Sequence, residues 1–189
     1  MCGRTDVLIH RYWTGPTSPP CEPFLGSCLK SLNPDAEITD WNDDTLPPTY
    51  HKYFNDAQVC PSDVYKHRAN IVRLLLLHDF GGAWYDYDII PLLPVSALPV
   101  PSVASHETLC NSFMAFNQGD HRLSEAIDAL AVQPAIGLRS MLVSGSLFLR
   151  RFLSDVHHLE YPFAPNGRLL SCDRPFAVQL GIAVPTHNE

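Results

Sequence analysis

Residues 62–94 read SDVYKHRANIVRLLLLHDFGGAWYDYDIIPLLP, a segment that combines a helical pattern, two glycines and a strand-like pattern. The apolar residues of its first half recur every three or four positions, as the buried stripe of a helix requires. Ser62 suits the N-cap of this helix. Gly81 and Gly82 predict its end, because a left-handed C-terminal cap favours a residue without a Cβ. We therefore expect a helix up to Gly81 and a strand over 83–90.

The predicted strand carries two carboxylates. Side chains alternate along a strand, so Trp84, Asp86 and Asp88 would share one face, with the two acids about 7 Å apart. This separation suits one metal ion and one neighbouring hydroxyl. Hard oxygen ligands favour magnesium or manganese, which in turn bridge phosphates. The alternative is a solvated turn that happens to hold two aspartates.

A polar face runs along the same predicted helix. Lys66, Asn70 and Arg73 lie at i, i+4 and i+7. Asn70 and Arg73 are thus one turn apart and can reach the same ligand.

These segments resemble a known family. RANIVR (68–73) and LLLLHDFGGAWYDYD (74–88) are similar to the sugar-binding signature of glycosyltransferases with the Asp-x-Asp motif. The branch includes yeast-type initiating α-mannosyltransferases, bacterial capsular-sugar transferases and the glucosylating domains of large clostridial toxins. The resemblance implies an α/β, GT-A-like nucleotide-sugar-binding fold with a mostly parallel central sheet flanked by helices. It also implies retention of the anomeric configuration.

The resemblance implies three catalytic residues. Asp88 would be the direct metal ligand, Asp86 would contact the ribose and metal-bound water, and Arg73 would hold the donor near its sugar and diphosphate. Asn70 stands where the family usually has Asp, and Trp84 stands where Tyr is usual. Both are expected to line the donor nucleotide.

The resemblance extends to the N-terminus, where IHRYWTG (9–15) looks like the family's opening strand. There Trp13 would stack on the nucleotide base, while backbone atoms of Tyr12 read the base edge. Asn111 is a donor-sugar contact by analogy, and an ordinary strand-end hydrogen bond is the alternative.

Two later segments complete the expected site. Ser144 and Gly145 form a small-residue turn before a predicted helix, and such a turn can receive a donor-sugar or acceptor hydroxyl. A simple helix cap is the alternative. His187 is the candidate metal ligand beside Asp88, since imidazole binds manganese, and a frayed tail is the alternative. The expected cofactor is Mn²⁺ or Mg²⁺.

Length and composition set further limits. A chain of 189 residues suggests one glycosyltransferase catalytic domain over residues 1–189. The formal charge of −7 makes duplex nucleic acid an improbable partner. Six cysteines without metal-site spacing are expected to be mostly reduced, buried thiols. No leader or long apolar run is present, which predicts a cytoplasmic protein without a membrane span.

The remaining elements follow from local patterns. We expect strands at 6–12, 36–41 and 109–116, helices at 24–32, 123–130 and 147–153, loops or turns at 15–23, 42–49 and 91–101, and an irregular or short helical segment at 50–61. The strand, helix, strand order at the start predicts a parallel sheet with the ligand at its carboxyl ends. His157 and His158 are expected in a solvated loop.

The sequence thus predicts a metal-dependent retaining glycosyltransferase that uses a nucleotide-diphosphate sugar, a UDP-sugar in preference to a GDP-sugar. The acceptor hydroxyl could belong to a carbohydrate, protein, lipid or other molecule. One alternative is a non-catalytic nucleotide-sugar-binding module. Another is a phosphatase of the haloacid-dehalogenase type, which also carries Asp-x-Asp after an apolar strand. In that class the motif lies on the first strand and a later lysine is needed, whereas no Lys follows Lys66 here.

Overall fold

The computed structural model describes residues 7–15, 19, 22–106, 108–133, 137–160 and 177–179. Its strands are β1 (Leu8–Tyr12), β2 (Glu37–Trp41), β3 (Gly82–Tyr85), β4 (Ile89–Pro91), β5 (Ser102–His106), β6 (Thr108–Phe116), β7 (His157–Glu160) and β8 (Ala177–Gln179). Its α-helices are α1 (Glu22–Leu32), α2 (Val64–Phe80), α3 (His121–Ala131), α4 (Ser140–Val143) and α5 (Ser146–Leu149). Short 3₁₀ helices are η1 (Pro48–Tyr53), η2 (Asp56–Gln58), η3 (Pro61–Asp63) and η4 (Val95–Ala97).

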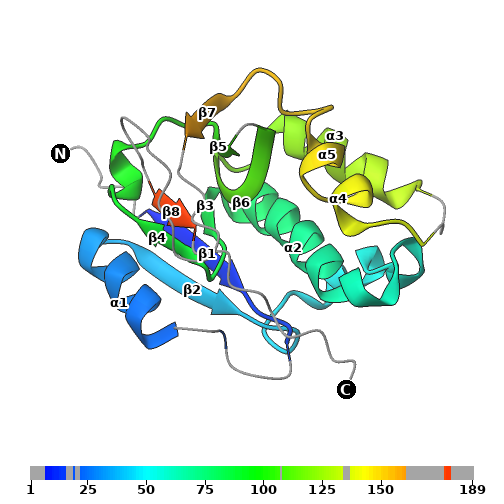
Figure 1. The fold of residues 1–189 in the computed structure, drawn as a ribbon, viewed down its shortest axis with the longest axis horizontal. Coiled ribbons are helices and arrows are strands. Elements are labelled where there is room, and N and C mark those ends of the chain that lie inside the picture. The colour runs from blue at the N-terminus through cyan, green and yellow to red at the C-terminus, as the bar shows by residue number, and fades with distance from the viewer. Residues whose placement is uncertain are drawn as a thin grey trace.

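A six-stranded mixed sheet in the order β2-β1-β3-β6-β5-β7 forms the centre (Figure 1). Strand β1 is parallel to β2 and β3, and β5 is parallel to β7. Strand β6 is antiparallel to both β3 and β5, so it alone runs against the others. The predicted mostly parallel sheet flanked by helices is confirmed. A separate two-stranded sheet pairs β4 with β8.

The sheet has a hydrophobic core on each face. Helices α2, α3 and α5 cover one face, and α1 with the β4–η4 segment covers the other. Strand β3 shows the alternation directly, because Trp84 packs into the core around α2 while Ala83 and Tyr85 pack into the opposite core. The two buried faces explain why this strand has no charged side chain before Asp86.

The glycine pair ends α2 as predicted. The Gly81 N–H donates to the Leu77 carbonyl, and Gly81 and Gly82 have φ angles of 68° and 91°. A Cβ on Gly82 would collide with the Leu8 carbonyl oxygen of β1. The close approach of β3 to β1 therefore requires glycine here.

The continuous strand predicted over 83–90 is wrong. Strand β3 ends at Tyr85, and the chain turns through 86–88 before β4 begins. The Ile89 N–H donates to the Asp86 carbonyl at 3.2 Å, which closes this turn. The Asp86 N–H donates to the Ser112 carbonyl at 2.8 Å and fixes the turn against β6. The two aspartates consequently lie in a tight turn and not along one strand face.

Two strands of the sheet were not predicted. Strand β5 consists of small and polar residues near prolines, and β7 is a polar edge strand, so neither has an apolar alternation. The loop expected at His157 and His158 is therefore wrong, although both side chains are exposed as expected. The predicted helix at 147–153 is also shorter, since α5 ends at Leu149.

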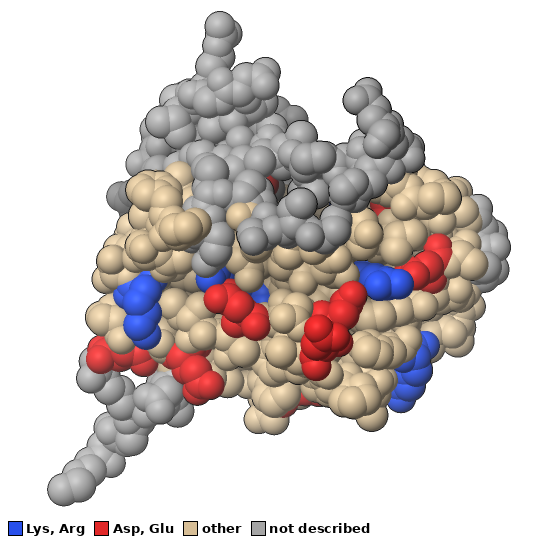
Figure 2. Space-filling model, turned by 90° about the horizontal axis from the view of Figure 1, so that it is seen from below, with Lys and Arg blue, Asp and Glu red and all other residues tan. Residues whose placement is uncertain are grey.

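Other expectations concern the whole chain. Cys28, Cys60 and Cys110 are free thiols, but they are half-buried and not buried as expected. Within the described ranges, no helix is both long and apolar enough to cross a membrane. Seen from below the view of Figure 1, acidic and basic side chains are interspersed on the surface (Figure 2). The single catalytic domain and the cytoplasmic location stay predictions.

Candidate active site

The turn that contains the Asp-x-Asp motif is fixed by a buried arginine. Arg73 of α2 places a terminal nitrogen 3.1 Å from Asp86 Oδ1, and the Trp84 indole N–H donates to the same oxygen at 2.7 Å. The Arg73 guanidinium also lies over the Trp84 ring, 4.9 Å from its centroid. Only 4% of the Arg73 side chain is exposed, compared with 29% of Asp86. The structure thus brings these three predicted residues together.

Burial sets the electrostatics of this pair. Burial raises the pKa of Asp86, and the Arg73 charge and the Trp84 hydrogen bond oppose that rise. Burial likewise lowers the pKa of Arg73, and the charges of Asp86 and Asp88 act in the opposite direction. Both carboxylates of the motif therefore lie within electrostatic reach of one guanidinium. The buried Arg73 charge depends on Asp86, because an unpaired charge at this depth is costly.

The middle residue of the motif is held from the other side. The Tyr87 hydroxyl donates to Asp40 at 3.0 Å, and the Arg11 guanidinium lies 4.6 Å from the centroid of the Tyr87 ring. Arg11 in turn makes a two-pronged contact with Asp40, at 2.7 and 2.9 Å. The rings of Tyr87 and Trp13 also form a T-shaped pair, with centroids 5.8 Å apart. Contacts with Arg11 of β1 and Asp40 of β2 thereby fix the middle of the turn.

Two of the predicted sugar or acceptor contacts, Asn111 and Ser144, join Asn70 in one hydrogen-bonded chain. The Asn111 side chain donates to Asn70 Oδ1 at 2.9 Å, and Asn70 Nδ2 donates to Ser144 Oγ at 3.3 Å. A Cβ on Gly145 would lie 3.1 Å from Asn70 Nδ2 and 2.7 Å from the Met141 Cα, so the chain packs tightly at this turn. Arg73 also donates to the Asn111 carbonyl and so connects this chain to the Asp-x-Asp turn.

His67 ends the chain of hydrogen bonds and was not predicted. It is fully buried, and its Nδ1 lies 2.9 Å from Ser144 Oγ. Burial lowers the pKa of His67, which favours the neutral imidazole. A neutral Nδ1 that accepts from Ser144 leaves the serine oxygen free to accept from Asn70. The sequence signal was its position three residues before Asn70, on the same helical face.

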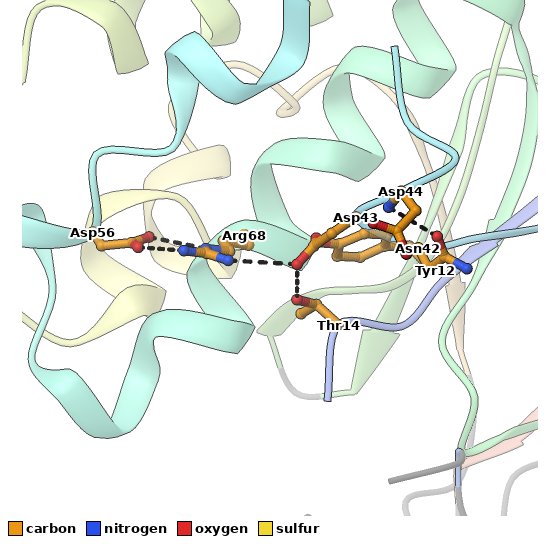
Figure 3. Close-up of polar contacts among 7 residues, drawn as sticks. All are labelled: Tyr12, Thr14, Asn42, Asp43, Asp44, Asp56 and Arg68. Carbon is orange, nitrogen blue, oxygen red and sulfur yellow. Dashed lines mark hydrogen bonds and ion pairs between the residues drawn. The ribbon is translucent and has the colours of Figure 1, made fainter. Parts of the chain in front are cut away.

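A second polar cluster lies at the carboxyl ends of β1 and β2 (Figure 3). Tyr12 and Thr14 both donate to the Asp43 carboxylate, the latter at 2.8 Å. Arg68 of α2 lies 3.5 Å from Asp43 and 2.6 Å from Asp56. Burial and the Asp43 hydrogen bond raise the pKa of Tyr12, so its hydroxyl stays protonated. Asp43 lies two residues beyond the end of the predicted second strand, and the rule that ligands bind at carboxyl ends of parallel strands could have identified it.

The expected base-stacking residue lies beside this cluster. Trp13 is half-buried. Its backbone N–H donates to the Trp41 carbonyl at 3.0 Å, which extends the pairing of β1 with β2. Gly15 packs against the indole, since a Cβ on Gly15 would come within 2.9 Å of the Trp13 ring. The Tyr12 hydroxyl is hydrogen-bonded to Asp43, so the expected contact with a nucleotide base would come from the Tyr12 backbone. Stacking on Trp13 stays a prediction.

The carboxylates of the motif fit a hard divalent cation. Asp86 and Asp88 supply oxygen donors at a half-exposed turn. No group of three His, Cys, Asp or Glu side chains in the described part of the chain is placed to hold a metal ion by itself. Mg²⁺ is commonly bound by one or two carboxylates with water and substrate phosphates filling the remaining positions, and these residues fit that pattern. His187 lies outside the described residues, and strand β8 is the described segment closest to it in sequence.

A surface depression elsewhere does not coincide with this site. Its volume is about 290 Å³, and it lies between α2, α3 and η1 near the C-terminal end of α2. Tyr50, His78 and Asp79 contribute to its lining. None of the predicted site residues that the structure describes lines it, so we do not assign this depression to the donor site.

Comparisons with known proteins agree with this geometry. Residues 24–109 match the family described as "Glycosyltransferase sugar-binding region containing DXD motif". A solved structure titled "PaToxG Glycosyltransferase" matches with a TM-score of 0.59 at 17% identity, over 78% of this chain and 68% of that chain. Comparison with curated protein sequences found no significant match. The chain therefore has the fold of a GT-A-type glycosyltransferase.

The match to the family model includes the predicted site residues around the motif. Both aspartates of the motif and Arg73 lie inside the matched segment, as do Asn70 and Trp84. Residues 24–109, a little under half of the chain, thus match the sugar-binding region of glycosyltransferases that contain the Asp-x-Asp motif.

Proposed function

We propose that this protein is a metal-dependent, retaining glycosyltransferase that moves a hexose from a nucleotide-diphosphate donor to an acceptor hydroxyl. A UDP-sugar is the donor we favour over a GDP-sugar. The observation that carries the proposal is the Asp-x-Asp turn, held by Arg73 and Trp84 on one side and by Tyr87 contacts on the other. A turn fixed from two sides keeps the two carboxylates pre-organised before a donor arrives, which is the basis of electrostatic catalysis.

The roles of the motif residues differ. Asp88, with Asp86 beside it, would hold Mn²⁺ or Mg²⁺, and the bound metal would neutralise charge on the leaving diphosphate. Asp86 is already paired with Arg73, so we assign it to positioning and to contacts with the ribose. Arg73 is nearly buried and donates to Asp86, the Asn111 carbonyl and the Ala69 carbonyl. Its main contribution is therefore its charge and its hold on the turn.

The reaction needs no separate general base. In a front-side displacement the acceptor oxygen bonds to the anomeric carbon while the bond from that carbon to the diphosphate oxygen breaks. The acceptor proton passes to the leaving phosphate oxygen. Asn70, Asn111 and Ser144 would then orient sugar or acceptor hydroxyls, because their amide and hydroxyl groups both donate and accept.

Ligand-induced stabilisation tests the donor class. The melting temperature is measured with UDP, GDP, UDP-sugars and GDP-sugars, each with and without manganese. A ligand at 100 times its dissociation constant adds about 2.7 kcal/mol to the unfolding free energy. A shift that requires both manganese and a uridine nucleotide is the expected result. No shift with any combination would overturn the proposal.

The second candidate is a module that binds a nucleotide sugar without turnover. The neutral Asn70, where the family usually has Asp, is the observation in its favour. Such a module would show the same stabilisation and release no free sugar from the donor. The phosphatase alternative has less support, since its nucleophilic aspartate would need to be free, whereas Asp86 is paired with Arg73.

A further inference from the structure

Helices α4 and α5 expose apolar side chains beside the candidate active site. Met141 and Leu142 of α4 are 50% and 48% exposed, and Leu147 of α5 is 39% exposed. Figure 1 shows the two helices next to each other on the outside of the molecule, beside α2 and α3. We call residues 138–151, which contain both helices, the α4–α5 hairpin.

The opposite side of the hairpin is anchored in the protein. Val143, Phe148 and Leu149 are buried, and the last two belong to the core around α2. The N–H groups of Ser144 and Gly145 both donate to the Ser140 carbonyl at 2.9 Å. The exposed aliphatic side chains are therefore presented by a fixed backbone.

The charge of this region differs from that of the whole protein. Residues 129–154 contain three arginines and no Asp or Glu, although the chain carries a formal charge of −7. Arg139 stands at the start of the hairpin with 63% of its side chain exposed, and it contacts the buried Asp63 at 3.2 Å. Arg150 and Arg151 stand at its end, are exposed, and form no salt bridge with any described residue.

We propose that the α4–α5 hairpin binds the surface of an anionic lipid bilayer. Exposed aliphatic side chains flanked by arginines are the pattern that lies in the headgroup region, with the apolar groups inserted and the cations near lipid phosphates. Negatively charged lipids attract nearby Lys and Arg, and an acid-free segment avoids the opposing repulsion. The overall charge of −7 makes the protein as a whole a poor ligand for such a surface, so binding depends on the hairpin.

The hairpin also lies where membrane binding would matter to the reaction. Its Ser144 accepts from Asn70, one of the residues at the sugar end of the site. Insertion of Met141 and Leu142 into a bilayer would bring membrane-attached acceptors close to the transferred sugar. Binding to the bilayer depends only on the fold and the surface, so it can be tested independently of donor turnover.

Vesicle co-sedimentation of the full chain tests the proposal. The probes are vesicles of phosphatidylcholine alone and of phosphatidylcholine with phosphatidylserine. We expect binding to the anionic vesicles that weakens with added salt and is weak on the neutral ones. Arg150→Gln with Arg151→Gln should weaken binding about 30-fold, since each cation near the surface contributes about 1 kcal/mol.

Apolar variants separate insertion from charge. Met141→Ser with Leu142→Ser should weaken binding by about 10-fold or more. Leu92→Ser with Leu93→Ser is the matched control, because these leucines are 43% and 42% exposed and lie on the β4–η4 segment. This control should bind as the wild type does.

Several results would overturn the proposal. They are no binding of the wild type to anionic vesicles, equal binding to neutral vesicles, and equal losses in the control and hairpin variants. The first two of these results concern the wild type alone, so the proposal can be overturned even if a variant fails to fold. Capture of an acidic protein without vesicle binding would assign the surface to a protein partner instead.

Discussion

Two arginines of helix α2 face opposite environments. Arg73 is 4% exposed and pairs with Asp86 at the Asp-x-Asp turn. Arg68, five residues earlier, is 27% exposed and pairs with Asp56 at the start of η2 and with Asp43, which lies just beyond β2. Burial lowers the pKa of Arg73, whereas hydrogen bonding to Asp56 raises the pKa of Arg68.

The difference separates two uses of an arginine–aspartate ion pair. At Arg73 the cost of removing charge from water makes the pair sensitive to the loss of either partner, and the pair fixes the Asp-x-Asp turn. At Arg68 water screens the charges, so the pair contributes little to stability. The first pair should control both folding and function, while the second should adjust the nucleotide end of the site.

Arg73→Ala should give the largest loss of stability. It leaves the Asp86 carboxylate unpaired and removes the guanidinium stacked on Trp84, so the free energy of unfolding should fall by about 3 to 5 kcal/mol. Urea denaturation of the variant and the wild type measures this loss. A loss below 1 kcal/mol, similar to that expected for Arg68→Ala, would remove the distinction between the two arginines.

Replacing both partners should recover much of that stability. Arg73→Met combined with Asp86→Leu leaves no unpaired charge and keeps an apolar contact with Trp84. The free energy of unfolding of the double variant should exceed that of Arg73→Ala by about 2 kcal/mol. Donor cleavage, followed in the same preparation by release of free sugar, should stay absent. Recovery of cleavage would show that the pair serves stability alone.

Two buried histidines should make stability depend on pH. Burial lowers the pKa of His10 and of His67, so the unfolded chain binds protons that the folded chain excludes. Stability should be full above the unfolded pKa near 6.5 and fall as the pH drops below it. Between pH 7.5 and 5.5 each histidine should lower the free energy of unfolding by up to about 1.4 kcal/mol.

Urea midpoints at the two pH values measure this effect. His10→Gln with His67→Gln should flatten the dependence, because neither side chain can then be protonated. If the wild type is more stable at pH 5.5 than at pH 7.5, the sign of this prediction is wrong.

Arg68→Ala should have the smallest effect. Its side chain is partly solvated, so the free energy of unfolding should fall by no more than about 1 kcal/mol. The loss should shrink further in 1 M salt, where the screening length is about 3 Å. Urea titrations at low and high salt, in parallel with Arg73→Ala, give the comparison. A salt-independent loss above 2 kcal/mol would place Arg68 with the buried residues.

Local patterns predicted the elements with an apolar period. Helix α2, its end at Gly81 and strand β6 all carry strong signals, and the order of elements indicated the parallel arrangement. Strands β5 and β7 lack such signals, because β5 consists of small and polar residues and β7 is a polar edge strand. Their pairing depends on neighbours distant in the sequence, which a local pattern does not contain.

The site was predicted in part for a similar reason. The structure brings together Asn70, Arg73, Trp84, Asp86, Asn111, Ser144 and Gly145. The strand expected to carry both aspartates is a turn, since backbone hydrogen bonds to β6 and across the turn outweigh β propensity. His67 was overlooked because its partner, Ser144, is 77 residues away. Such contacts become visible only in three dimensions.

The most direct test of the account is donor cleavage by the Asp88→Ala variant. Sugar release from the nucleotide sugar that stabilises the wild type is measured with manganese, beside Asp128→Ala, a change at an exposed acid of α3. The account predicts that Asp88→Ala abolishes metal-dependent cleavage while its unfolding free energy stays within about 0.5 kcal/mol of the wild type, and that Asp128→Ala cleaves normally. Wild-type turnover by Asp88→Ala would contradict the assignment of the Asp-x-Asp turn as the donor site.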